Sequence, residues 1–395
     1  MKVSRLLATL FVAAVAAAFS LEAGAQEKIK IGVPVDFTGA SAPLGARIKQ
    51  AVELFQDDNG TKIGGRDVEV IFRDITNGNA AVAKQVTEEL ILRDHVSLIV
   101  GLITTPEVAA IASLVTQAKV PTIPLIASTP ILMGLSPFIV RACNNMVSTV
   151  LPAAEWAYKN GKRRAYIAVM DFSPGYEVQE TFKKRFTELG GQVVGEDRVP
   201  TSTVDFSPVV ERIIRSDADV VQVFILSGSP SVAFIRALSA QGAFKQGKTF
   251  IGLVETDDSD LPAFDDSVIG VVSSFPYAPT LDNPENRKFK ASYLKKFGTL
   301  VGLGYAHASA YDGMRVAYRM IESQQGKPFD GAAAVEAVKG YTWNGPRGPI
   351  TIDPATRDVI ENLYIRRVEK VDGRLQNVVI DTFPHMMPGV KKAGQ

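Results

Sequence analysis

The stretch "GLITTPEVAAIA", residues 101–112, decides the fold. The apolar run Val96–Val100 ends at a glycine, and two hydroxyl side chains, Thr104 and Thr105, follow shortly after it. A helical pattern then starts at Pro106, and proline is favoured at the first position of a helix. A short, nearly continuous apolar run that leads into a helix is typical of a parallel strand whose sheet is covered on both faces.

The arrangement recurs in "VPTIPLIASTP", residues 120–130, where Ser128 and Thr129 follow a second apolar run. Because one helix separates the two runs, we expect neighbouring parallel strands whose carboxyl ends lie at the same edge of the sheet. Short hydroxyl side chains at a helix start either cap the helix or, with its free N–H groups, bind an anion. The spacing leaves both interpretations open.

Alternating strand and helix patterns on both sides of this segment predict an α/β fold. The first run has strand patterns at 28–37, 66–74, 96–101 and 120–124 and helical patterns at 45–58 and 79–94. The second run has strand patterns at 163–170, 191–199, 218–226 and 248–254 and helical patterns near 176–189, 205–215 and 230–242. Two such runs predict two Rossmann-like lobes with parallel central sheets and a ligand cleft at the carboxyl ends of the strands.

The last third of the chain breaks this rhythm. Helical patterns cover 282–298 and 304–322, and a hairpin pattern covers 364–380 with its turn at Asp372 and Gly373. A tail that returns after two α/β runs predicts several chain crossings between the lobes.

The N-terminus has the features of a secretory signal peptide, residues 1–25. Lys2 and Arg5 precede an apolar run from Leu6 to Phe19, and Ala23–Ala25 supplies small residues for cleavage. The run is short for a membrane span, although an N-terminal anchor is the alternative. Cleavage after Ala25 predicts a mature chain in the periplasm, or a secreted one.

Charge and composition argue against nucleic acid and anionic membranes as partners. The chain has 43 Lys and Arg residues against 42 Asp and Glu residues, without a basic tract or an acidic tail. With 395 residues, of which 46% are hydrophobic, it can form two domains with a large core. Cys143 is the single cysteine, which excludes an internal disulfide.

Sequence signatures of catalysis and of cofactor binding are missing. The three histidines, His95, His307 and His385, lack metal-ligand spacing, and there is no G-x-S-x-G, P-loop or dinucleotide motif. We therefore expect neither an enzyme nor a bound cofactor or metal. The acidic cluster "ETDDSD", residues 255–260, is either an exposed turn or places Glu255 at the edge of the cleft, as a partner for a ligand amine or hydroxyl.

Three stretches, in this order, resemble the branched-chain amino acid type of periplasmic solute-binding protein, the extracellular receptors of ABC importers. They are "IKIGVPVDFTGASAPLGARIKQAVELF" (29–55), "VSLIVGLITTPEVAAIASLVTQAKVPTIPLIASTP" (96–130), and "DNPENRKFKASYLKKFG" (282–298) with "ASAYDGMRVAY" (308–318). The likeness covers nearly all of the mature chain. It implies a type I periplasmic binding fold that closes two lobes around one small ligand.

The resemblance also implies which residues bind the ligand. The carboxylate of the ligand would meet the two hydroxyl loops, its amine an acid near Glu255 with Asp257 in reserve, and its body an aromatic near Tyr305. The full set of implied ligand-binding positions is Ser41, Leu44, Thr104, Thr105, Ala127, Ser128, Phe172, Gly228, Glu255, Phe275 and Tyr305.

Three departures from the family pattern concern the ligand. Leu44 stands where amino acid binders often have a tyrosine, and Gly228 stands at another tyrosine position. In the second lobe, Pro174 replaces a common aromatic, with Phe172 and Tyr176 nearby. The cleft is therefore expected to be roomier, and a hydrophobic amino acid, an aromatic or other organic acid, and an amide all stay open as ligands.

The resemblance further implies a division of the chain and a set of partners. The expected N-terminal lobe comprises 26–142 and 275–356, and the C-terminal lobe 143–274 and 357–395. The three expected crossings lie near Arg141–Asn144, Ser273–Phe275 and Ala355–Val359. The expected protein is a monomer that docks on the membrane permease of an ABC importer. An exported α/β hydrolase acting on amides or esters, and a ligand sensor for a membrane kinase, are the alternatives.

Overall fold

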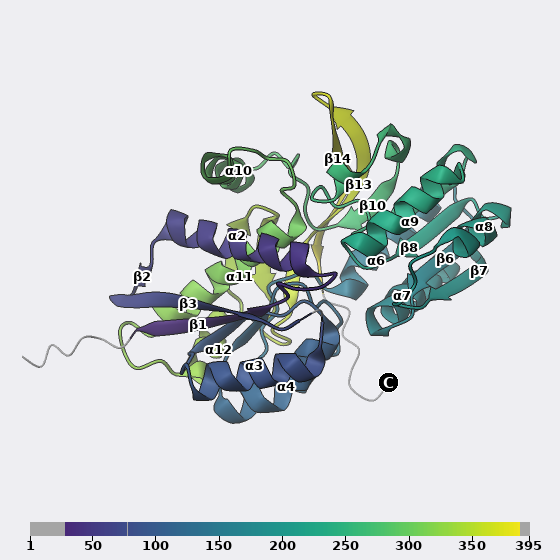
Figure 1. Cartoon of the computed structure of the whole chain (residues 1–395). Coiled ribbons are helices and arrows are strands. Elements are labelled where there is room, and N and C mark those ends of the chain that lie inside the picture. The colour runs from purple at the N-terminus through teal and green to yellow at the C-terminus, as the bar shows by residue number, and fades with distance from the viewer. Residues whose placement is uncertain (1–27, 77, 388–395) are drawn as a thin grey trace, which may run out of the picture.

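Two β-sheets with helices on their faces lie side by side in the computed structural model, which describes residues 28–76 and 78–387 (Figure 1). The predicted signal peptide, residues 1–25, lies outside the described residues. None of the helices within the described ranges is both long enough and apolar enough to span a bilayer.

The first sheet has five strands in the order β2-β3-β1-β4-β5. Its strands are β1 (Ile29–Val35), β2 (Lys62–Ile63), β3 (Arg66–Asp74), β4 (Leu98–Gly101) and β5 (Thr122–Pro124). All pairings are parallel except that of the edge strand β2. At Gly101 a Cβ would lie 2.5 Å from the carbonyl oxygen of Pro34, so only glycine fits where β4 meets the end of β1.

Helices cover both faces of the first sheet (Figure 1). They are α2 (Ala42–Asn59), α3 (Ala80–Leu92), α4 (Thr105–Ala118), α11 (Tyr305–Glu322) and α12 (Gly331–Val338). Helix α11 packs along α2, so a segment from the last third of the chain completes the core of the first lobe. The short helix α5 (Leu132–Leu135) follows β5, and α10 (Pro284–Phe297) also contacts α2.

The second sheet has nine strands, with the path β11-β12-β13-β10-β9-β8-β6-β7 and β14 paired to β13. Its strands are β6 (Arg164–Met170), β7 (Gln192–Val199), β8 (Val220–Phe224), β9 (Thr249–Gly252), β10 (Val272–Phe275), β11 (Thr342–Gly345), β12 (Gly348–Ile352), β13 (Val359–Val371) and β14 (Arg374–Met386). Strands β6 to β10 pair in parallel, and β11 to β14 are antiparallel.

Side-chain alternation along β6 explains the layers of the second lobe. Ala165, Ile167 and Val169 pack with the core that contains α6 (Met146–Lys159) and α7 (Ser173–Glu188). The intervening Tyr166, Ala168 and Met170 pack on the opposite face, with the core that contains α8 (Ser207–Arg215) and α9 (Ser229–Ala240). A strand buried on both faces is nearly continuously apolar, as β6 is from Ala165 onward.

The prediction of an α/β fold with two largely parallel sheets is confirmed. The last strands of the chain extend the second sheet. Strands β11 and β12 form an antiparallel hairpin that pairs with β13, so sheet pairing places residues 342–352 in the nine-stranded sheet. Strands β11 and β12 are short, so they show little periodicity in the sequence, and the sequence analysis did not predict them.

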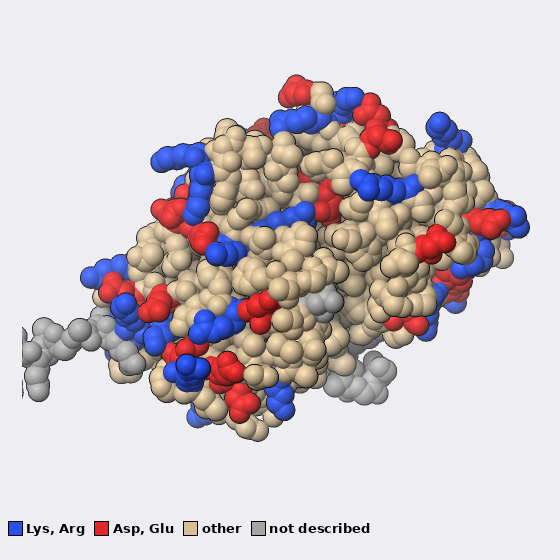
Figure 2. Space-filling model, in the orientation of Figure 1, with Lys and Arg blue, Asp and Glu red and all other residues tan. Residues whose placement is uncertain are grey.

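Surface charges agree with the balanced composition. On the face shown in Figure 2, acidic and basic side chains are interspersed, and neither sign forms a continuous patch. This face therefore offers no strongly basic surface of the kind that binds nucleic acid.

Candidate ligand-binding site

A cavity of about 130 Å³ lies between the two sheets. Its walls come from the segments that follow β1, β4 and β5 in the first sheet and β6, β8 and β9 in the second. The carboxyl ends of both sets of parallel strands therefore face one space, where open α/β sheets bind ligands. Of the residues predicted from the sequence, those that line the cavity are Ser41, Leu44, Thr104, Thr105, Ala127, Ser128, Phe172, Phe275 and Tyr305.

Hydroxyl side chains from the first sheet line this cavity. Thr104 and Thr105 lie at the start of α4, and Ser128 follows β5. The Thr105 and Thr129 hydroxyl oxygens are 2.5 Å apart, so a hydrogen bond joins the two loops directly. Thr104 is the N-cap residue of α4.

The start of α4 is capped by a carboxylate. Glu107 is buried, and its Oε2 accepts hydrogen bonds from the N–H groups of Ile103 at 2.8 Å and Thr104 at 3.0 Å. Burial raises the pKa of this carboxyl. Thr104 and Glu107 therefore form a capping box at the start of α4.

Two pairs of aromatic rings supply much of the apolar wall. The Phe172 and Phe224 rings are stacked, with centroids 6.0 Å apart and an interplanar angle of 11°. The Phe275 and Tyr305 rings meet edge to face at 4.5 Å. The Tyr305 hydroxyl donates to Asn144 Oδ1 and accepts from Asn144 N–H, both at 2.8 Å, so the phenol is already satisfied. Rings fixed in this way offer flat apolar surface to a ligand.

Asp257 is a carboxylate in the cavity wall. Its Oδ1 accepts from the Ser259 hydroxyl at 2.7 Å, and both carboxylate oxygens lie 3.3 Å from the N–H of Tyr305, the first residue of α11. Arg366 Nη1 lies 3.9 Å from Asp257 Oδ2. A carboxylate held in this way is a strong hydrogen-bond acceptor for a ligand group.

Two predicted residues do not line the cavity. Glu255 is 1% exposed, and its oxygens accept from the N–H groups of Ile225 and Leu253 at 2.6 Å each. Burial raises the pKa of Glu255 to about 7. Its carboxylate therefore joins the ends of β8 and β9, and the acid in the cavity wall is the reserve position, Asp257. Gly228 begins α9 with φ of 91°, and its neighbour Ser227 lines the cavity instead.

An ion pair connects the two lobes beside the cavity. Arg47 on α2 lies 2.8 Å from Asp260 in the loop after β9, and it also donates to the carbonyl oxygen of Ser259 at 3.2 Å. A Cβ on Gly228 would come 3.4 Å from the carbonyl oxygen of Ala40, so the lobes also approach each other there. The structure therefore has the lobes in contact at the edge of the site.

Several lining residues were missed from the sequence. They are Ala40, Ile103, Ile126, Asn144, Met146, Pro174, Phe224, Leu226, Ser227, Pro230, Leu253, Val254, Ser259 and Ala306. Phe224 and Leu226 could have been found, because they stand at the end of a predicted strand, as the hydroxyl residues do. Asn144 and Met146 carry no such signal, since a chain crossing brings them to the cavity.

Reactive groups near the site are poorly suited to catalysis. Burial raises the pKa of the Cys143 thiol to about 12 and lowers the pKa of His307 to about 3. A thiol that stays protonated is a weak nucleophile. No cluster of metal-ligating side chains occurs within residues 28–76 and 78–387.

The sequence as a whole matches the family model described as periplasmic binding protein over residues 28–374. The chain belongs to the periplasmic binding protein family. This binding protein is 37% identical to the Leu/Ile/Val-binding protein homolog 6 of Brucella melitensis over 380 residues, which cover 95% of this chain and 97% of that one. The family resemblance inferred from the sequence is confirmed.

Solved structures agree with this assignment. A solute-binding protein of an ABC transporter from Rhodopseudomonas palustris HaA2, in complex with p-hydroxybenzoic acid, has 37% identity and a TM-score of 0.89, with 91% of this chain and 98% of that chain covered. A second one, from Rhodopseudomonas palustris BisB5 with 3,4-dihydroxybenzoic acid, has 35% identity and a TM-score of 0.88, covering 92% and 99%. A leucine-binding protein from Thermotoga maritima, at 24% identity and a TM-score of 0.78 over 90% and 99% of the chains, shares the fold.

Proposed function

We propose that this binding protein is the extracytoplasmic receptor of an ABC importer for an aromatic carboxylate of the hydroxybenzoate class. The observation that carries the proposal is the meeting, in one cavity, of the two hydroxyl loops that hold Thr105 and Ser128 with two aromatic ring pairs. The ligands of the two Rhodopseudomonas palustris proteins support the same class.

Each part of the ligand would contact a different set of residues in the cavity. Its carboxylate would accept hydrogen bonds from Thr104, Thr105 and Ser128 and from the start of α4, where the helix dipole favours an anion. Its ring would lie against Phe172 and Phe275. A ring hydroxyl would donate to the Asp257 carboxylate, because ionised acceptors make stronger hydrogen bonds than neutral ones.

A hydrophobic α-amino acid is the second candidate, and Asp257 is the observation that favours it. An ammonium group buried in a closed cavity needs a carboxylate partner, and Asp257 would provide one. The name of the Brucella melitensis relative points the same way.

Calorimetry with benzoate, 4-hydroxybenzoate, 3,4-dihydroxybenzoate and leucine separates the two candidates. We expect 4-hydroxybenzoate to bind at least about tenfold more tightly than leucine, and also more tightly than benzoate, by roughly the worth of one hydrogen bond to a charged group. Asp257→Asn should abolish most of the advantage over benzoate. The control is Asp258→Asn, because the neighbouring Asp258 carboxylate lies outside this cavity and accepts hydrogen bonds from Asn377. Leucine binding more tightly than every benzoate would overturn the assignment.

The remaining parts of the proposal concern partners and location. The receptor would act in the periplasm as a monomer, release its ligand chemically unchanged, and dock on a membrane permease. Mass spectrometry of the released ligand tests the absence of chemistry, and a hydrolysed or altered product would favour the hydrolase alternative. Co-purification with a membrane kinase in place of a permease would favour the sensor alternative.

A further inference from the structure

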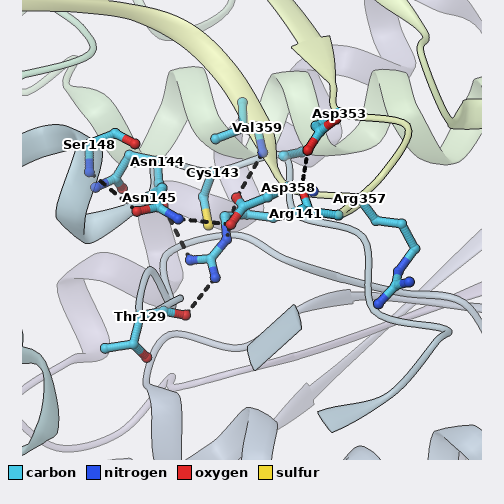
Figure 3. Close-up of polar contacts among 12 residues, drawn as sticks. Thr129, Arg141, Cys143, Asn144, Asn145, Ser148, Asp353, Arg357, Asp358 and Val359 are labelled. Atoms are coloured by element: carbon cyan, nitrogen blue, oxygen red, sulfur yellow. Dashed lines mark hydrogen bonds and ion pairs between the residues drawn. The ribbon is translucent and has the colours of Figure 1, made fainter. Parts of the chain in front are cut away.

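A buried arginine holds the loop that carries Ser128. Arg141 is fully buried and does not line the cavity. Its Nη2 donates to the carbonyl oxygen of Thr129 at 2.5 Å (Figure 3). Its Nη1 donates to the carbonyl oxygen of Ala127 at 3.2 Å. One guanidinium therefore binds the residues on both sides of Ser128.

The charge of Arg141 is balanced by a carboxylate that is itself fixed. Arg141 Nε and Asp358 Oδ1 are 2.9 Å apart (Figure 3). Asp358 also accepts from Asn145 Nδ2 at 2.8 Å and from the N–H of Val359 at 2.7 Å. A buried ion pair whose partners are held by further hydrogen bonds has one geometry, so the guanidinium cannot turn freely.

These contacts set the direction of the peptide groups in the loop. The Ala127 carbonyl also accepts from the Cys143 thiol at 3.3 Å, and the Ser128 carbonyl accepts from the N–H of Met146 at 2.8 Å. In a planar trans peptide the N–H points opposite to the carbonyl of the preceding residue. The Ser128 N–H therefore points away from Arg141 and Cys143.

We propose that Arg141 is a positioning residue of the ligand site, which aims the N–H and the hydroxyl of Ser128 at the ligand carboxylate without touching the ligand. The inference rests on the proposed function, since it requires a carboxylate at the hydroxyl loops. It adds a residue behind the cavity wall to the determinants of acid selectivity.

Lysine cannot replace Arg141 in this role. An ammonium keeps the charge that Asp358 needs, but it lacks the planar fork that reaches two carbonyls and a carboxylate together. Arg141→Lys is therefore expected to fold and to loosen the loop. Arg141→Gln combined with Asp358→Asn removes both charges and is the second variant, which avoids leaving a buried carboxylate unpaired.

Arg357 supplies a matched control. Its guanidinium donates to the carbonyl oxygens of Met133 at 2.7 Å, Ile139 at 3.1 Å and Ser136 at 3.2 Å. These contacts repeat the chemistry of Arg141 on a neighbouring segment, but none of the residues they hold lines the cavity. The Arg357 backbone carbonyl accepts from the Arg141 N–H at 3.0 Å, and Arg357→Lys keeps that contact. The variant therefore measures the cost of losing side-chain contacts to a segment outside the cavity.

The test compares 4-hydroxybenzoate with 4-hydroxybenzamide by calorimetry on the full mature chain. In Arg141→Lys the Kd for the acid should rise about ten- to a hundredfold, and that for the amide by less than about threefold, because the lost hydrogen bonds are charge-assisted only for the acid. Arg357→Lys should leave the ratio of the two Kd values unchanged. If Arg141 had only a structural role, Arg141→Lys would raise the Kd values of both ligands by the same factor.

Hydrogen exchange of the ligand-free protein gives a readout that needs no ligand. Arg141→Lys should speed exchange at residues 126–129, and Arg357→Lys should not. Unchanged exchange there, or an unchanged preference for the acid in both Arg141 variants, overturns the inference. If the wild-type protein does not prefer the acid, the proposed function is wrong. The exchange result then tests only whether Arg141 orders the loop that carries Ser128.

Discussion

Removal of the Ser128 hydroxyl separates ligand binding from helix capping. Ser128 lines the cavity between β5 and the four-residue helix α5, and Ile131 holds the N-cap position of that helix. Ser128→Ala therefore removes no cap, and we expect the midpoint of thermal unfolding without ligand to stay the same. A hydrogen bond to a charged group contributes about 1.5–3 kcal/mol, which converts to a roughly ten- to hundredfold higher Kd for 4-hydroxybenzoate.

Calorimetry measures this Kd, and differential scanning fluorimetry measures the unfolding midpoint without ligand. The control is Ser113→Ala, an exposed serine on α4 outside the cavity, which should change neither quantity. If Ser128→Ala lowers the unfolding midpoint while the Kd stays that of the wild type, the hydroxyl is structural. The assignment of this loop to the ligand carboxylate is then refuted.

Two further predictions concern the buried acid and the contact between lobes. Burial raises the pKa of Glu255 from 4.5 to about 7, so its stabilising effect is present below pH 4.5 and is lost as the pH rises to 7. In urea unfolding, Glu255→Gln should make the free energy of unfolding less dependent on pH between 4.5 and 7, while the Kd changes less than about threefold. A larger loss of affinity would restore Glu255 as a ligand anchor. Arg47→Ala removes the 2.8 Å ion pair with Asp260 and should raise the Kd by roughly three- to tenfold through a less favourable closure. X-ray scattering should show a larger ligand-free radius of gyration for this variant than for Lys49→Ala, whose ion-pair partner, Glu53, lies on the same helix; equal radii would contradict a role in closure.

Local chemistry determined much of the fold and one side of the site. Apolar strands bounded by glycine and by helix starts are readable without a structure, because periodicity and capping act within a few residues. The same rule found Thr104, Thr105 and Ser128, since all three stand directly after strands whose carboxyl ends must share one edge of a sheet.

The tertiary structure decided what each polar group near the site can do. Glu255 and Asp257 stand two residues apart in one acidic cluster, yet one carboxylate is occupied by backbone N–H groups and the other lines the cavity. A strand end and a turn reverse the direction of side chains within that distance, and sequence spacing does not record the reversal. Arg141 and Asp358, far apart in the chain, meet because the segment before α6 lies beside the segment before β13. Partners of this kind are fixed by long-range packing, so only the folded chain identifies them.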